Sequence, residues 1–280
     1  MIQLPIIGAL LEAVGTIFEK KILNNRYINY KNYTVYEFFS IIIVMSTFVF
    51  FFWKLEPEAL SLMNILIFMF VVVVAIIANL LIFHSLKRED VSEFEPLWLT
   101  QPLFVIVLAF ILYPVERNWI VFGLAMVASI SLVLSHVKKK HLEFDKYTIT
   151  ALLGSFLFAV ELIASKPILD YYSPFSFYFL RCLFVFIIVL FIFRPSFRKV
   201  GGKNWAMIFL VGLIWALYRA ITYYGYQHLG IIFTTILFIL SPVFLFFFAI
   251  VFLKEKPTKR QIISTIIIVI CVALAVFFQY

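Results

Sequence analysis

NILIFMFVVVVAIIANLLIFHSL, residues 64–86, is an apolar run without a single Asp, Glu, Lys or Arg. A helix of this length spans about 34 Å at about 1.5 Å per residue, which matches the hydrocarbon core of a bilayer. Because lipid offers no hydrogen-bond partners, backbone groups in the core must bond within their own segment. The run therefore predicts a transmembrane helix.

Nine further runs of spanning length predict an all-α integral membrane protein with ten transmembrane helices. The 280-residue chain is 64% hydrophobic and 14% charged, with a mean hydropathy of +1.07. Soluble domains, by contrast, are about half apolar and about a quarter charged. The ten predicted helices cover residues 4–23, 34–53, 64–86, 92–114, 117–137, 147–168, 174–193, 204–228, 230–253 and 259–278.

A basic linker at residues 138–146 separates five predicted helices from five. This division predicts two five-helix repeats of one ancestral unit, at residues 1–137 and 147–280. With five helices in each repeat, the second repeat must enter the membrane from the opposite side, so the two are predicted to be inverted. Inverted repeats enclose a shared cavity near the membrane midplane in many secondary transporters.

Matching landmarks in the two halves support the duplication. Pro102 precedes a long apolar run that ends at Glu116, and Pro242 precedes another that ends at Glu255. The proline and the glutamate are 14 residues apart in the first half and 13 in the second. The two prolines are expected to be gating or structural elements, because proline interrupts helix hydrogen bonds. The four glutamates near loop ends are read as solvated helix caps: Glu93, Glu95, Glu116 and Glu255.

Lysine and arginine concentrate in the odd-numbered connections, which hold 18 of them against three in the even-numbered connections. Cytoplasmic loops carry such an excess of basic residues. The bias predicts a multi-pass protein of the cell or cytoplasmic membrane with the linker at residues 138–146 in the cytoplasm and both termini on the opposite side. The basic residues are spread over short connections rather than one face, so no nucleic-acid partner is expected.

The five-plus-five arrangement, the proline-to-glutamate landmarks and the pair Pro174 and Arg181 together resemble the EamA type of the drug/metabolite transporter superfamily. The resemblance covers essentially the whole chain. It implies a secondary transporter that exports amino acids or related metabolites, with cytoplasmic termini, opposite to the charge count. The first half departs from the pattern at Thr34 and Ile42, which stand roughly where the proline and arginine would be.

Charged residues inside predicted helices are candidate functional residues, because burying a charge in the membrane costs about 2.5–3.5 kcal/mol on insertion scales. Glu161 and Glu12 occupy similar places in the two halves and are candidate proton carriers; the alternative is permanent pairing with an arginine. Arg219 is a candidate ligand for an anionic group, the alternative being a salt bridge to Glu161. Arg181 is expected to be a gating or structural residue.

Aromatic and uncharged polar residues complete the predicted substrate site. Several lie within one or two turns of Arg219 on the same predicted helix, and others lie on the third and fourth predicted helices. The candidates are Trp215, Tyr218, Thr222, Tyr223, Asn79, His84, Trp98 and Gln101.

The leading hypothesis is a secondary transporter that moves a small polar or amphipathic metabolite, including an anionic one, by alternating access, with proton coupling or exchange. The alternative is a translocator of lipids or lipid-linked headgroups. No nucleophile, metal-ligand or nucleotide motif is present, so neither enzymatic activity nor a cofactor or metal is expected. One chain of ten helices can enclose a pathway, so a monomer suffices.

Overall fold

The computed structural model describes residues 2–25, 28–88, 97–136, 146–197, 200–244, 246–247 and 258–279. Within these ranges the chain is helical and forms no β-strand, which confirms the predicted all-α class. The helices are α1 (Gln3–Leu23), α2 (Tyr30–Ser46), α3 (Leu62–Arg88), α5 (Gln101–Leu112), α6 (Trp119–His136), α7 (Lys146–Leu169), α8 (Pro174–Phe193), α9 (Gly202–His228), α10 (Ile231–Phe238) and α12 (Lys259–Gln279). Linker residues 138–145 lie outside the described ranges.

Five described helices, α3, α7, α8, α9 and α12, are long and apolar enough to cross a membrane. Helices α5, α6 and α10 are shorter apolar helices, and together with α1 and α2 they are consistent with ten predicted helices. The outward side of α3 shows the lipid-facing character directly, since Phe70, Val73 and Ile77 are 50%, 47% and 44% exposed. The chain is an integral, multi-pass membrane protein.

Helix α2 is shorter than the predicted segment 34–53. It ends at Ser46, and a separate 3₁₀ helix follows at Val49–Phe52. The Ser46 and Thr47 hydroxyls donate hydrogen bonds of 2.7 Å to the carbonyls of Ile43 and Val44. These side chains compete with the regular backbone ladder, and an apolarity scale does not register that competition.

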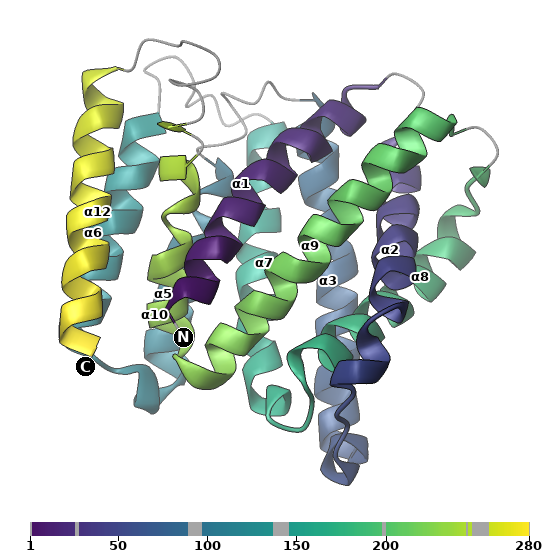
Figure 1. Cartoon of the computed structure of the whole chain (residues 1–280), viewed down its shortest axis with the longest axis horizontal. Coiled ribbons are helices and arrows are strands. Elements are labelled where there is room, and N and C mark those ends of the chain that lie inside the picture. Colours follow the sequence, from purple (N-terminus) through teal and green to yellow (C-terminus); the bar gives the residue numbers. More distant parts are fainter. Residues whose placement is uncertain are drawn as a thin grey trace.

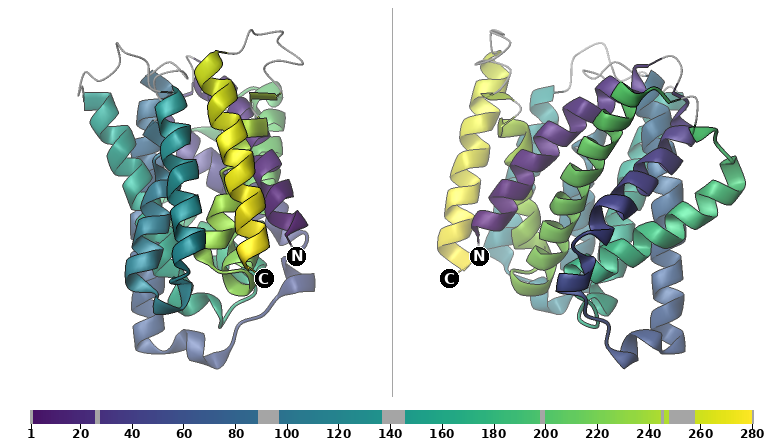
Figure 2. Two further views of the ribbon diagram at one scale, coloured as in Figure 1. Left: turned by 90° about the vertical axis from the view of Figure 1, so that its left-hand side faces the viewer. Right: turned by 45° about the vertical axis from the view of Figure 1, so that its right-hand side comes forward.

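Most of the described basic side chains gather at one end of the bundle. Both chain termini lie at one end of the bundle (Figures 1 and 2). The last turns of α1, α3 and α8 and the first turns of α7, α9 and α12 lie at the opposite end. That other end carries Lys20, Lys21, Lys87, Arg88, Lys146, Arg194, Lys203, Lys259 and Arg260. The alternation that the sequence predicts is thus present in the fold; which end faces the cytoplasm stays a prediction.

Helices of the first half pack chiefly on helices of the second. Helix α3 packs against α7, and α1 packs against α9. Helices α2 and α8 contact each other, as do α6 and α12. Exchanging the two predicted repeats converts the α3–α7 contact into the α9–α1 contact and leaves α2–α8 and α6–α12 unchanged, the pattern expected of a two-fold relation between the halves.

A helix break precedes the landmark proline in each half. Turns at residues 99–100 and 239–240 interrupt the helices just before Pro102 and Pro242. The two breaks are separated by the same 140 residues as the two prolines. Interrupted helices of this kind expose unpaired backbone groups toward the protein interior in many transporters.

Glu116 caps a helix in the other half of the chain, whereas the sequence predicted only a solvated cap near a loop end. Its carboxylate accepts hydrogen bonds from the backbone amides of Ile231 and Ile232, at 2.8 and 3.2 Å, at the N-terminus of α10. Gly230 precedes them with φ of 89°, a conformation that favours glycine. A Cβ on Gly230 would lie 2.9 Å from the Glu116 carboxylate.

Gly230→Ala is therefore expected to lower the thermal stability of the protein, because the methyl group strains the backbone and displaces the cap. The loss should be about 1–2 kcal/mol, comparable to the removal of a helix cap. Melting temperatures of the detergent-purified protein measure it. Gly123→Ala in α6, where no atom lies near the added methyl group, is the matched control; equal melting of the two variants would contradict the assignment.

Candidate functional site

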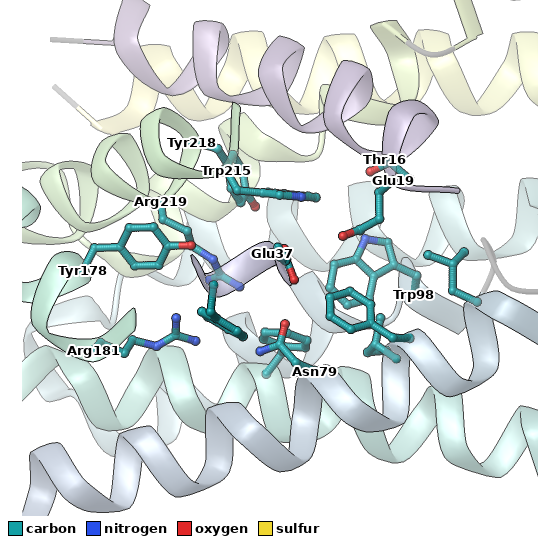
Figure 3. A pocket seen from close by; sticks show the side chains of 15 residues that line it. Thr16, Glu19, Glu37, Asn79, Trp98, Tyr178, Arg181, Trp215, Tyr218 and Arg219 are labelled. Atoms are coloured by element: carbon teal, nitrogen blue, oxygen red, sulfur yellow. The ribbon is translucent and has the colours of Figure 1, made fainter. Parts of the chain in front are cut away.

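A partly open cavity lies between the two halves of the chain. Its walls come from α1, α2, α3, α7, α8 and α9 and from Trp98, which precedes α5 (Figure 3). Seven of the 15 lining residues are aromatic, namely Phe38, Phe83, Trp98, Phe158, Tyr178, Trp215 and Tyr218. Mixed aromatic and polar walls are typical of a small-molecule site.

Four charged side chains line the cavity, one from each of four helices: Glu19 from α1, Glu37 from α2, Arg181 from α8 and Arg219 from α9. Figure 3 shows Glu19 and Trp98 toward one end, and Arg181 with Tyr178 toward the other. Both halves of the chain therefore contribute charge, with the acids from the first half and the bases from the second.

Glu161 of α7 is the counter-ion of both arginines. Its Oε1 lies 2.9 Å from Arg181 Nε and its Oε2 lies 3.8 Å from Arg219 Nη1. The Tyr223 hydroxyl donates a hydrogen bond of 3.0 Å to Glu161 Oε1. The carboxylate is completely buried, so its charge depends on these partners. Glu161 is thus paired with arginine, which was the alternative to its role as a proton carrier in the sequence analysis.

Glu19 and Glu37 have no such partner. In the ranges that the structure describes, neither carboxylate lies within 4 Å of a lysine or arginine nitrogen. Glu19 Oε1 accepts a hydrogen bond of 3.1 Å from the Tyr33 hydroxyl, and Glu37 Oε2 is buried without a hydrogen-bond partner among the described residues. Buried acids without a direct ion pair are costly, and such groups mark functional sites in membrane proteins. Arg181 and Arg219 act on Glu37 only at longer range.

Glu12 lies near the cavity and does not line it. It shares a face of α1 with Thr16 and Glu19, at intervals of four and seven residues. The carboxylate is half-buried, with Tyr218 and Ser241 beside it.

The structure brings six of the predicted site residues into the cavity wall. They are Arg219, Trp215, Tyr218, Asn79, Trp98 and Arg181. Both arginines also stack on rings: the Arg219 guanidinium lies 5.3 Å from the Phe158 ring and 5.7 Å from Tyr218, and that of Arg181 lies 5.6 Å from Tyr178. Such cation–π contacts hold a guanidinium in one orientation.

The remaining predicted site residues lie outside the cavity wall. The Thr222 hydroxyl donates to the Tyr218 carbonyl at 2.9 Å, and Tyr223 supports Glu161. The His84 ring packs 5.0 Å from Tyr30 and 5.4 Å from Tyr147, near the basic end of α3. Gln101 is buried beside the helix break. Pro102 and Pro242 flank the two breaks.

The sequence-based reading missed Glu19 and Glu37. Glu19 precedes Lys20 and Lys21, so it resembled a solvated cluster at a helix end. Glu37 follows the α2 cap residue Asn29 by eight positions, as Arg181 follows the α8 cap residue Ser173. The equal spacing marks Glu37 as the counterpart of Arg181. Glu37 lies between Thr34 and Ile42, the residues that the sequence comparison placed roughly opposite Pro174 and Arg181.

The fold is that of a multi-pass membrane protein with a cavity between the two halves of its chain. Residues 146–277 match the EamA-like transporter family, so the resemblance read from the sequence is confirmed and the second half of the chain is an EamA-like domain. Proteins of this family are membrane transporters of small molecules.

Structural comparison extends the match of the fold to nearly the whole chain. A protein of known crystal structure superposes with a TM-score of 0.74 at 14% sequence identity, covering 99% of this chain and 97% of the other. In all, 27 chains of solved structures match significantly. No curated protein sequence does.

Proposed function

We propose that this protein is a secondary transporter that carries a small polar or amphipathic organic molecule through the central cavity by alternating access. The observation that carries the proposal is the charged, aromatic cavity enclosed between the two halves of the chain. A binding chamber at the junction of two halves allows one half to rock against the other and expose the chamber to each side in turn.

The proposed architecture is an inverted pair of five-helix repeats, residues 1–137 and 147–280. Three observations support it. The landmark prolines and the helix breaks before them share one offset, the helix contacts between the halves exchange in pairs, and Glu37 and Arg181 hold equivalent places after their helix caps.

Proton coupling is assigned in this proposal to Glu19 and Glu37. A proton carrier must bind its proton and the substrate in turn, so its carboxylate has to face the cavity. Glu19 and Glu37 do so without a basic partner among the described residues. Glu161 and Glu12 are weaker candidates, because two guanidinium groups hold the first and the second lies outside the wall.

Asn79→Trp is expected to reduce transport at least fivefold, because the indole would fill the chamber between α3 and the charged residues. Purified protein in liposomes, tested with a panel of radiolabelled amines, amino acids and organic acids, measures the effect. Ile77→Trp, on the lipid-facing side of the same helix and 44% exposed, is the matched control.

A parallel assay of fluorescent lipid flipping tests the translocator alternative. Lipid movement that requires the protein, together with no transport from the panel, would replace the proposed function with that alternative. Equal transport by the Asn79→Trp and Ile77→Trp proteins would remove the cavity from the pathway.

A further inference from the structure

We infer that the substrate is an organic cation whose ammonium group binds between Glu19 and Glu37, with its apolar part against the neighbouring aromatic rings. The inference rests on the proposed function and specifies its substrate class. Glu19 and Glu37 line the same chamber as Trp98, Phe83 and Trp215.

The charge balance around the chamber favours a cation. Two arginines, Arg181 and Arg219, face three carboxylates, Glu161, Glu19 and Glu37, of which Glu161 contacts both arginines. With all groups ionised, one negative charge is left over, and half-buried Glu12 adds a second. A bound ammonium group would reduce this imbalance, whereas a bound carboxylate would increase it.

The positions of the charges favour the Glu19 end of the chamber for the ammonium group. Arg181 contacts Glu161 and stacks on Tyr178, away from Glu19 (Figure 3). Glu37 lies between the two ends, with the Arg219 side chain pointing toward it, and Glu19 lies on the side away from both arginines (Figure 3). An ammonium group on the Glu19 side of Glu37 would therefore contact the two acids on the side away from the guanidinium groups.

The aromatic walls suit the organic part of such a cation. Indole and phenyl rings attract cations through their π faces, with tryptophan the strongest of the side chains. Trp98 and Glu19 point toward one another, so one ligand could contact an indole and a carboxylate together (Figure 3).

The test uses ligands that share one skeleton and differ only in charge. 2-Phenylethylamine, phenylalanine and 3-phenylpropionate form one series, and tryptamine, tryptophan and indole-3-propionate form a second. Binding to the purified full-length protein is measured by calorimetry. In at least one series we expect the amine to bind at least tenfold more tightly than the amino acid, with no binding of the acid.

Glu19→Gln and Glu37→Gln should each weaken amine binding about tenfold, as expected for the loss of a charge-assisted contact. Glu58→Gln, at an exposed acid in the loop before α3, should bind the amine like the wild type. The ligand series on the unaltered protein needs no variant, so misfolding of a variant cannot obscure the result.

Two outcomes would overturn the inference. One is tighter binding of the amino acid or the acid than of the amine. The other is no binding of either amine. In both cases the proposed function is tested separately: transport that the Asn79→Trp substitution reduces would still support it. If neither amine binding nor cavity-dependent transport is found, both the substrate class and the proposed function are rejected.

Discussion

Glu161→Gln should lower the stability of the protein more than any single exchange in the cavity wall. The substitution leaves Arg181, only 2% exposed at its side chain, without its closest counter-ion, and also removes the partner of Arg219. Breaking one side of a buried ion pair costs about 3–5 kcal/mol, because an uncompensated charge stays buried. We expect a large fall in melting temperature and in the yield of folded protein.

Two further variants make this expectation specific. Glu161→Gln combined with Arg181→Gln should recover much of the lost stability, since the pair is removed together and the imbalance with it. Glu12→Gln, at a half-buried acid without an ion pair among the described residues, should melt near the wild type. If the Glu161→Gln protein is instead as stable as the wild type and loses only proton-driven transport, Glu161 is the proton carrier.

The fold was largely predictable from the sequence because lipid imposes a simple rule on apolar segments. The apolar run at residues 64–86 lies within α3, Leu62–Arg88, and the run at 174–193 is α8 itself. Prediction was weaker where polar side chains act locally. The early end of α2 at Ser46 depends on two hydroxyl-to-carbonyl bonds, which hydropathy does not register.

The site was only partly predictable, because residues close along one helix share a face, whereas partners from other helices cannot be read from spacing. Trp215, Tyr218 and Arg219 were found from their positions on α9. Tyr223, on the same helix, points to Glu161 of α7, which only the packing of the two halves determines. Glu19 lies in the wall because α1 packs on α9, a contact between distant parts of the sequence.

The sign of the effect of Arg219→Gln on binding separates the two substrate classes. Arg219 lines the cavity without touching either free acid, so its loss makes the chamber more negative. Removing one charge at about 8 Å, with an effective dielectric constant of about 20, changes the electrostatic energy of a bound ion by about 2 kcal/mol. A cationic substrate should therefore bind about tenfold or more tightly, and an anionic one should bind correspondingly more weakly.

Transport turnover of the cation should fall in the same variant. The tighter complex releases its substrate more slowly, so KM and kcat should both decrease, as expected when the ground state is stabilised. Arg219→Lys keeps the charge and loses the planar contacts with Phe158 and Tyr218. It should bind the cation nearly as the wild type does. Weaker binding of the amine by Arg219→Gln would contradict this expectation.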